Sequence, residues 1–224
     1  MKMSADSPSV EDKVRDHFHD DAGRFDAIYE SKKGLIGRFI DNWWRGVVQK
    51  RLELNVEKLQ PLAGKRILDV GCGSGRFCIA FAREGAEKVV GIDFAIGMIE
   101  IADKLAVEAG VGDRCEFIVG AFPDDIDRSD APFDACTGNG FFDYIEKPVP
   151  IIAAMRVMTK GKLIMSFPKA VEWRVPVRRF RFWLKGTPLF LYRQQQVRDI
   201  LTEAGVTDYE FIYLDRDYLI VANV

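Results

Sequence analysis

The sequence has few of the residues that mark metal sites, disulfide frameworks or membrane spans. Its 224 residues include only two histidines and four cysteines. The cysteines show no paired metal-ligand spacing, and no apolar run approaches the length of a membrane-spanning helix. The N-terminus is polar and charged and lacks the apolar core of a signal peptide. We therefore expect a protein of the reducing cytoplasm that holds no metal.

The two histidines, His17 and His19, are followed by two aspartates. Residues two apart on a helix do not share a face, so the pattern favours a solvated helix surface over a metal site. A role for either histidine as a general base, in a segment folded over an active site, stays open as an alternative.

The chain also lacks a strong charge of either sign. Its net charge is −2, so no overall field draws it towards nucleic acid. Its hydrophobic content of 48% is enough for one full core. We expect a single globular unit, with a tail and helical cap over residues 1–60 and a larger domain over residues 61–224.

Glycine, in contrast, is concentrated in one stretch that organises the chain. The apolar run Ile67–Val70 is short enough to be a strand buried on both faces. Gly71, Gly73 and Gly75 follow at alternate positions, and apolar residues at helical spacing continue to Ala82. Strand, glycine turn and helix form the opening of a nucleotide-type βαβ unit, in which the helix N-terminus presents N–H groups to a ligand.

The spacing around these glycines indicates the kind of ligand. A dinucleotide fingerprint would have its third glycine where this chain has Arg76. Asp69 would repel a pyrophosphate but suits an ammonium group. Asp93, at the end of the next apolar run, is placed to accept both ribose hydroxyls of an adenosine. An adenosine with an amino-acid tail describes S-adenosylmethionine.

On these residues the sequence resembles the class I, Rossmann-like, S-adenosylmethionine-dependent methyltransferases. The carrying segments are residues 68–75, residues 90–93 and the sequence Pro132-Phe133-Asp134-Ala135. The resemblance implies an α/β fold: a doubly wound seven-stranded sheet, mostly parallel with an antiparallel last strand, plus an N-terminal helical cap. It also implies S-adenosylmethionine as cofactor and S-adenosylhomocysteine as product. The residues expected to bind the cofactor are Asp69, Gly71, Cys72, Gly73, Gly75, Asp93, Phe94, Met98, Ala121 and Asn139.

The residues expected to contact the adenine of the cofactor differ from the usual pattern of the family. Phe94 and Met98, in a segment that opens the helix after the second strand, are positioned to sandwich the base. The family usually has an acidic residue just after the third strand, which we expect over residues 115–119. Here Gly120 and Ala121 follow instead, so a backbone carbonyl or Asp124 would have to bind the adenine amino group.

The remaining strands are expected from residue 133 to the exit at Asn139, over residues 161–168, and in a terminal hairpin over residues 209–214 and 218–222. Strands one and four should flank the switch in strand order, where ligands bind. This places Asn139 at the methyl-donor end and Asp143 and Tyr144 at the substrate mouth. The preceding pair, Phe141 and Phe142, is as compatible with core packing as with substrate contact.

Two further segments are candidates for the substrate. Apolar residues at helical spacing predict helices over residues 10–29 and 33–59. These helices either pack on the helical layer or cover the cofactor, with Tyr29 or Arg38 reaching its carboxylate. In residues 173–185, Arg174, Arg178 and Arg181 form a basic stripe. It would bind an anionic substrate, rest on an anionic membrane surface, or be a solvated face.

The favoured function is methyl transfer to a small or medium-sized organic acceptor, anionic or aromatic, as in the methyltransferases of quinone and tetrapyrrole biosynthesis. Asp143, Tyr144 and His19 are candidates for a general base. A nicotinamide-dependent oxidoreductase is disfavoured by Asp69 and Arg76, and a non-catalytic binding protein remains as the alternative outside enzymes. Nucleic acid is not expected as a partner. The sequence leaves the acceptor and the oligomeric state open.

Overall fold

The computed structural model describes residues 48–127, 131–170 and 189–224. A helix over residues 48–59 comes first. The strands are β1 (Arg66–Val70), β2 (Lys88–Asp93), β3 (Cys115–Val119), β4 (Phe133–Gly138), β5 (Thr159–Pro168), β6 (Tyr209–Tyr213) and β7 (Asp217–Asn223). The labelled helices are α3 (Arg76–Arg83), α4 (Ile96–Glu108), the short 3₁₀ helix η2 (Phe142–Tyr144), α5 (Pro148–Val157) and α7 (Gln194–Glu203).

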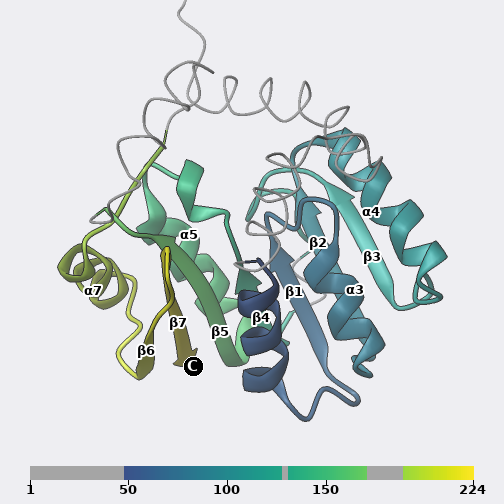
Figure 1. Ribbon diagram of the computed structural model, residues 1–224, viewed down its shortest axis with the longest axis horizontal. Coiled ribbons are helices and arrows are strands. Elements are labelled where there is room, and N and C mark those ends of the chain that lie inside the picture. The colour runs from purple at the N-terminus through teal and green to yellow at the C-terminus, as the bar shows by residue number, and fades with distance from the viewer. Residues whose placement is uncertain (1–47, 128–130, 171–188) are drawn as a thin grey trace, which may run out of the picture.

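The strands form one seven-stranded sheet in the order β3-β2-β1-β4-β5-β7-β6 (Figure 1). β1 pairs in parallel with both β2 and β4, and β7 is antiparallel to both β5 and β6. The predicted doubly wound sheet, mostly parallel with an antiparallel last strand, is therefore confirmed. The order reverses between β1 and β4, so the exits of these two strands lie side by side at the carboxyl edge of the sheet.

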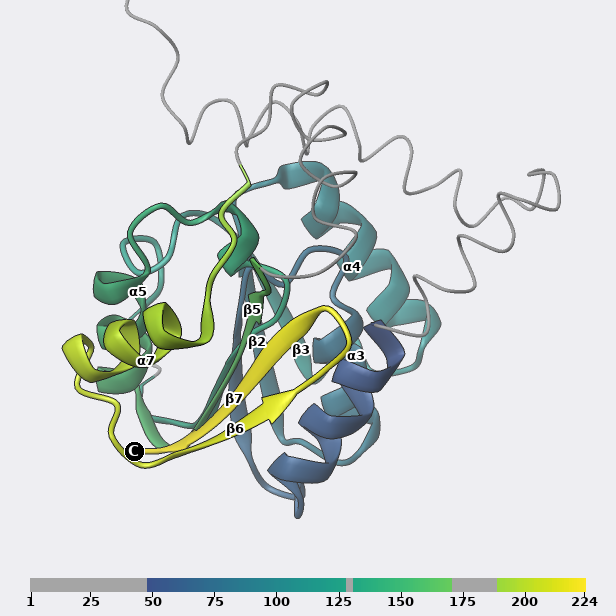
Figure 2. The ribbon, with the colours of Figure 1, turned by 60° about the vertical axis from the view of Figure 1, so that its left-hand side comes forward.

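Two helical layers cover the sheet. Figure 2 shows α5 and α7 on one side and α3, α4 and the helix over residues 48–59 on the other. Each side has its own core cluster, one around Phe142, Met155 and Leu201 and the other around Leu59 and Phe81. β1 contributes Leu68 to the first cluster and Ile67 to the second. Its continuous apolar run is explained by burial on both faces.

The helix over residues 48–59 belongs to the second layer. Leu59 is 1% exposed and Val48 and Leu52 pack beside the same cluster. The structure confirms this part of the predicted helix over residues 33–59. The rest of that helix and the one predicted over residues 10–29 lie outside the described residues.

The predicted strand boundaries agree with the structure to within two residues, with the largest difference at the start of β5, and one helix was missed. β5 begins at Thr159 rather than at Gly161, because Thr159 pairs with Phe133 beyond an irregularity in the β4 register. The helix α5 was not singled out from the sequence, although Pro148 opens its first turn. Proline suits that position because the first N–H of a helix has no partner within it.

Candidate functional site at the carboxyl edge of the sheet

The glycine loop after β1 places its glycines in two different environments. All three have positive φ angles, at 68° for Gly71, 51° for Gly73 and 71° for Gly75. A Cβ added at Gly71 would lie 2.4 Å from Cδ2 of Phe141. A Cβ added at Gly73 would meet no atom of the described residues within 4 Å. Among the described residues, the loop therefore packs against the protein at Gly71 and leaves open space at Gly73.

The exit of β2 holds the loop in this shape. The Ile92 carbonyl accepts hydrogen bonds from the N–H groups of Gly71 (2.9 Å) and Cys72 (3.2 Å). Asp93 Oδ2 accepts one from the Gly73 N–H at 2.9 Å. Two strand exits, joined by backbone and carboxylate hydrogen bonds, thus form one rigid unit.

Asp93 itself lies where the sequence predicted it, at the end of β2. Its second oxygen, Oδ1, accepts a hydrogen bond from the Ala95 N–H at 3.0 Å. Burial raises the pKa of the carboxyl, and the N–H donors of Ala95 and Gly73 oppose that rise. A carboxylate oxygen has more than one acceptor direction, so Asp93 can accept further hydrogen bonds from a ligand beside Gly73. Its role at a ribose stays a prediction.

Asp69, in β1, is turned into the protein. It is 2% exposed. Its Oδ1 accepts a hydrogen bond from the Thr137 hydroxyl at 2.5 Å, and its Oδ2 accepts one from the Cys78 thiol at 3.6 Å. Burial raises the pKa of Asp69 from 3.8 to about 7, against the lowering effect of these two hydrogen bonds. The predicted contact with an ammonium group is not tested by this geometry.

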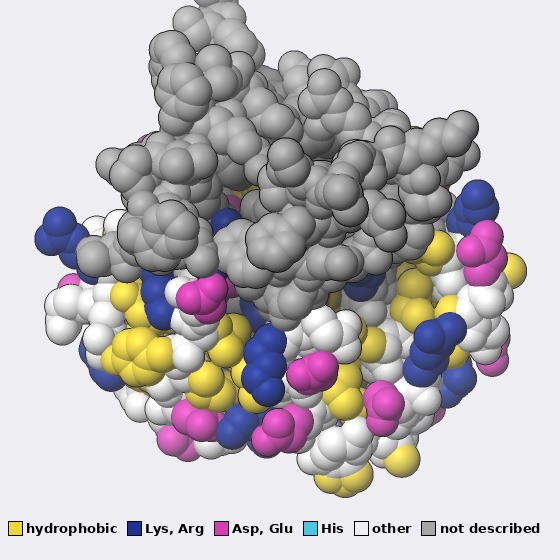
Figure 3. All heavy atoms as spheres, in the orientation of Figure 1, with side chains coloured by type: hydrophobic (Ala, Val, Ile, Leu, Met, Phe, Trp, Pro, Cys, Tyr) yellow, Lys and Arg dark blue, Asp and Glu magenta, His cyan; other side chains and the backbone are white. Residues whose placement is uncertain are grey.

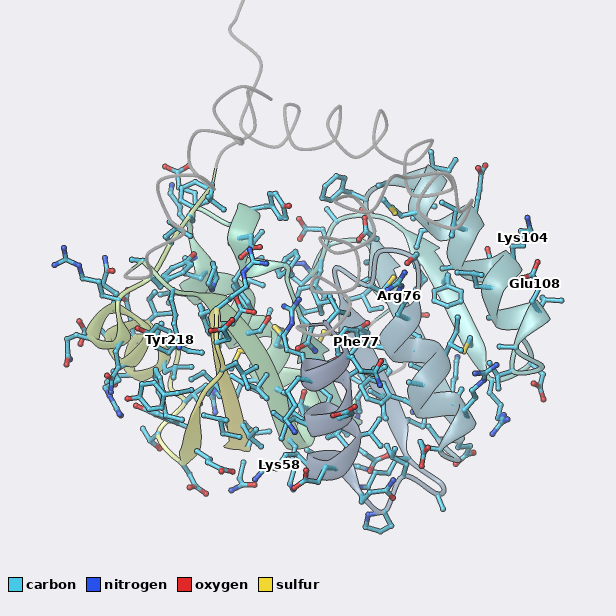
Figure 4. All side chains as sticks on the ribbon, viewed as in Figure 1. Lys58, Arg76, Phe77, Lys104, Glu108 and Tyr218 are labelled. Atoms are coloured by element: carbon cyan, nitrogen blue, oxygen red, sulfur yellow. The ribbon has the colours of Figure 1, made fainter. Side chains whose placement is uncertain are left out.

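The N-terminus of α3 completes the loop. Gly75 is the N-cap residue and, in the described structure, no side chain caps the helix. Figure 4 shows Arg76 and Phe77 at this end of α3. Cys72, between the glycines, is 8% exposed and its thiol lies 3.7 Å from the Gly73 carbonyl oxygen. The helix dipole and the N–H groups of the first turn favour an anionic group at this place.

The predicted adenine side is apolar. Met98 is buried at 2% exposure, Phe94 is partly exposed, and Ile96 is 46% exposed at the start of α4. At the exit of β3, Asp125 Oδ2 accepts a hydrogen bond from the Ala121 N–H at 2.8 Å. Asp125 thus closes the turn that follows β3.

The exit of β4 brings in residues that sequence reasoning missed. Asn139 pairs with Asn55 through two amide hydrogen bonds, and the Gly140 N–H donates to Ser166 Oγ, which also accepts from Arg51 Nη1. Arg51 and Asn55 both come from the helix over residues 48–59. The two residues are four apart and so share one face of the helix. The same helix also carries the polar residues Gln49, Lys50, Glu53, Glu57 and Lys58. Nothing in the sequence therefore set this pair apart.

The aromatic pair after Asn139 divides between two roles. Phe142 is fully buried and stacks on Phe167, with 4.6 Å between ring centroids, so for this residue core packing is the observed role. Phe141 is partly buried against Gly71. Asp143 and Tyr144 are partly exposed in η2, beside the β4 exit. Their contact with a substrate stays a prediction.

Several predicted residues lie outside the described part of the chain: His17, His19, Tyr29, Arg38 and the basic stripe of residues 173–185 with Arg178. Within residues 48–127, 131–170 and 189–224, no three His, Cys, Asp or Glu side chains form a group that could hold a metal ion. The described helices include none that is long and apolar enough to cross a membrane.

Comparison with known proteins agrees with the geometry at this edge. A family model described as a methyltransferase domain matches residues 62–205. The chain belongs to this methyltransferase family. The match begins just before β1 and ends after α7, so it includes the glycine loop, Asp93 and Asn139. The resemblance inferred from the glycine motif is confirmed.

Similar curated proteins include two named ubiquinone biosynthesis O-methyltransferase. The one from Xylella fastidiosa (strain 9a5c) is 31% identical over 147 residues, which are 61% of this chain and 58% of that protein. The one from Xanthomonas axonopodis pv. citri (strain 306) is 36% identical over 150 residues, 62% of this chain and 61% of that protein. The aligned part of the chain thus spans less than two thirds of these relatives.

Among solved structures, magnesium protoporphyrin IX methyltransferase from Synechocystis PCC 6803 shares the fold. Its structure with bound S-adenosylhomocysteine superposes with a TM-score of 0.77 at 20% identity, covering 96% of this chain and 99% of that one. Its structure with bound S-adenosylmethionine gives a TM-score of 0.75 at 19% identity, covering 98% and 99%. At these identities the likeness concerns the fold.

One landmark of the resemblance serves the fold rather than the site. Asp134 lies near the start of β4, at the amino edge of the sheet. Its Oδ2 accepts a hydrogen bond from the Arg66 N–H at 2.8 Å, and its Oδ1 lies 3.0 Å from Lys160 Nζ. Asp134 therefore ties β4 to the start of β1, far along both strands from the glycine loop.

Proposed function

We propose that this chain is an S-adenosylmethionine-dependent methyltransferase that acts on a small or medium-sized organic acceptor. The observation that carries the proposal is the joined exit of β1 and β2: the open position at Gly73 lies beside a carboxylate that is fixed by the same loop. Family membership and the relatives named as O-methyltransferases support methyl transfer. The two neighbours crystallised with S-adenosylmethionine and S-adenosylhomocysteine support the cofactor.

The residues at this edge fit such a cofactor. Asp93 accepts the ribose hydroxyls, and Phe94, Met98 and the chain at Ala121 contact the adenine. The glycine loop from Gly71 to Gly75, with the α3 N-terminus, binds the amino-acid tail. When bound, the cofactor supplies a methyl group made electrophilic by its sulfonium.

The chain's own residues orient the acceptor and keep water out. Asn139 stands at the exit of β4, and Asp143 and Tyr144 follow it in η2 with partly exposed side chains. Where the acceptor loses a proton at reaction, Asp143, Tyr144 or His19 takes it. The relatives named for ubiquinone biosynthesis favour an oxygen atom as the acceptor.

Titration calorimetry tests the cofactor assignment. The chain is expected to bind S-adenosylhomocysteine and not NAD. Asp93→Ala removes the ribose acceptor and is expected to cost about 1.5–3 kcal/mol of binding free energy, as for a hydrogen bond to a charged group. Asp199→Ala, which removes an exposed carboxylate on α7, is the matched control and should bind normally. Tight NAD binding without any response to the sulfur compounds would overturn the proposal.

Turnover distinguishes the enzyme from a non-catalytic binding protein. Cell extract incubated with the chain and isotopically labelled S-adenosylmethionine is expected to contain a labelled small molecule, which mass spectrometry identifies. Binding of S-adenosylhomocysteine without any labelled product across extracts would favour the binding protein.

The acceptor is anionic, and the basic stripe of residues 173–185 contacts it. The support is sequence composition, because Arg174, Arg178 and Arg181 cluster in a chain of net charge −2, and arginine matches carboxylate and phosphate geometry. Replacing all three with Gln should weaken acceptor binding, less so at high salt, and spare cofactor binding. Normal turnover at every ionic strength would contradict this, and loss of co-sedimentation with anionic vesicles would indicate a membrane contact instead.

The chain acts in the cytoplasm and has no nucleic-acid partner. All four cysteines are free thiols, as a reducing compartment favours. On the face shown in Figure 3, the described Lys and Arg side chains are interspersed with Asp and Glu, unlike a nucleic-acid-binding surface. Fractionation of cells that express the tagged chain tests the location.

A further inference from the structure

A polar cluster joins the helix over residues 48–59 to the exit of β4. Asn55 is fully buried, and the Arg51 side chain is only 13% exposed. Both reach the carboxyl edge of the sheet, where Asn55 contacts Asn139 and Arg51 contacts Ser166. Burying an amide and a guanidinium is costly unless their hydrogen bonds are made, so the partners of these two side chains determine what the cluster does.

Asn55 is bonded to Asn139 in both directions. Its Nδ2 donates to Asn139 Oδ1 at 3.3 Å, and its Oδ1 accepts from Asn139 Nδ2 at 3.0 Å. Asn55 Nδ2 also donates to the Arg51 carbonyl oxygen at 2.8 Å. A reciprocal amide pair determines the orientation of both side chains. Asn139, the residue expected at the methyl-donor end, is therefore oriented by a residue 84 positions earlier in the chain.

Arg51 holds the next residue along the exit. Its Nη1 donates to Ser166 Oγ at 3.0 Å, and the same oxygen accepts from the Gly140 N–H at 2.8 Å. Asp217 Oδ2 lies 3.7 Å from Arg51 Nη1 and partly balances its charge. Gly140 has a φ of 73°, and a Cβ there would lie 3.3 Å from Arg51 Nη1. The guanidinium and the turn thus occupy adjoining space.

The exit in turn contacts the glycine loop. Phe141, directly after Gly140, packs so closely on Gly71 that a Cβ at Gly71 would lie 2.4 Å from its ring. Gly71 and Cys72 are bonded to the exit of β2, as described above. A continuous set of contacts therefore runs from the helix through Asn139 and Gly140 to Phe141 and the loop.

We propose that Asn55 and Arg51 are positioning residues of the cofactor site, which act by holding the β4 exit against the glycine loop. This inference rests on the proposed function, because the site they position is the one assigned there to S-adenosylmethionine. Neither residue needs to contact the cofactor. Their effect on binding passes through Asn139 and the Gly140 turn.

A double-mutant cycle with S-adenosylhomocysteine as the probe tests this. Asn55→Ala is expected to weaken binding about three- to tenfold, the effect of losing about one hydrogen bond. The same change in an Asn139→Ala background is expected to weaken binding by less than about twofold, because the side chain that Asn55 orients is already absent. Thr159→Val is the control: it removes a buried hydrogen bond to the Met155 carbonyl at the opposite edge of the sheet. It should lower the thermal midpoint without changing affinity.

Each outcome separates the two proposals. If the unaltered chain does not bind S-adenosylhomocysteine, the proposed function fails. If it binds and Asn55→Ala binds equally well, the positioning role fails and Asn55 serves stability alone. If Asn55→Ala weakens binding but the two changes are additive, Asn55 does not act through Asn139 and the positioning role fails as well. Should Asn55→Ala not fold, Ser166→Ala removes the oxygen shared by Arg51 and Gly140 with a smaller change. Its affinity should fall by about threefold or more, and an unchanged affinity would overturn the inference.

Discussion

The two edges of the sheet use polar side chains in opposite ways. At the carboxyl edge, polar groups are buried and bonded between segments far apart in the sequence, as in Asn55 with Asn139 and Thr137 with Asp69. At the amino edge, charged pairs are partly exposed: Lys160 is 57% and Asp134 25% exposed, and Glu210 is 54% and Lys58 26% exposed. Figure 4 shows Lys58 at the opposite end of the molecule's core from Arg76.

The difference follows from the cost of burial. An exposed ion pair exchanges water for a partner at little gain, so it tolerates change. A buried polar group needs its hydrogen bonds and therefore constrains the position of every group that supplies them. We infer that sequence changes at the carboxyl edge alter the site, whereas changes at the amino edge alter only local stability.

The largest expected effect contrasts two glycines of the same loop. Gly71→Ala adds a Cβ that overlaps Phe141 and strains a left-handed residue, which together should lower the free energy of unfolding by about 2–5 kcal/mol. Gly73→Ala carries only the backbone strain, about 1–2 kcal/mol. Because its Cβ enters the open space at the loop, it should abolish binding of S-adenosylhomocysteine while the chain remains folded.

Urea unfolding and calorimetry on both variants check this contrast. Equal destabilisation by the two changes would show that Phe141 moves away from Gly71 at no cost. Normal binding by Gly73→Ala would show that the open position is not part of the cofactor site.

The second effect concerns Asp69 and pH. Because burial raises the pKa of Asp69 from 3.8 to about 7 in the folded chain, the folded state holds its proton more tightly than the unfolded state. The stabilising contribution is complete below the unfolded pKa and is lost as the pH rises through the folded one. At one pKa unit per about 1.4 kcal/mol, the loss amounts to up to roughly 4 kcal/mol.

Asp69→Asn removes this titration. Relative to the unaltered chain, the variant is expected to gain stability steadily as the pH rises from about 4 to about 8. Chemical unfolding across this range measures the difference between the two proteins, which cancels the contribution of other carboxyl groups. Parallel curves of the free energy of unfolding against pH for the two proteins would show that Asp69 is ionised in the folded chain over the whole range.

The smallest effect is expected at the amino edge. Lys160→Gln removes the exposed partner of Asp134 and should change the free energy of unfolding by less than about 1 kcal/mol. Affinity for S-adenosylhomocysteine should not change. A loss of affinity comparable to that of a carboxyl-edge variant would remove the distinction between the two edges.

Local patterns made much of this architecture predictable. The glycine spacing, the acid that ends β2 and the alternation of apolar runs depend on residues close together in the chain. The backbone conformation and the burial that these residues require can be predicted from the local sequence. The strand β3 and the terminal hairpin of β6 and β7 follow from such patterns, and so does the position of Asp93. The sheet order follows from the family resemblance that the same motifs support.

Tertiary structure alone decided which distant side chains meet. Nothing near Asn55 in the sequence indicates that it bonds to Asn139, and nothing near Asp69 indicates that its carboxyl is turned towards Thr137 and Cys78. Phe141 and Phe142 are neighbours of one residue type, yet one packs on the glycine loop and the other in the core. Hydrogen bonding and burial depend on geometry between elements, which local spacing does not encode. The sequence by itself therefore determined the kind of site, and the packing of the helices on the sheet decided how its residues are held.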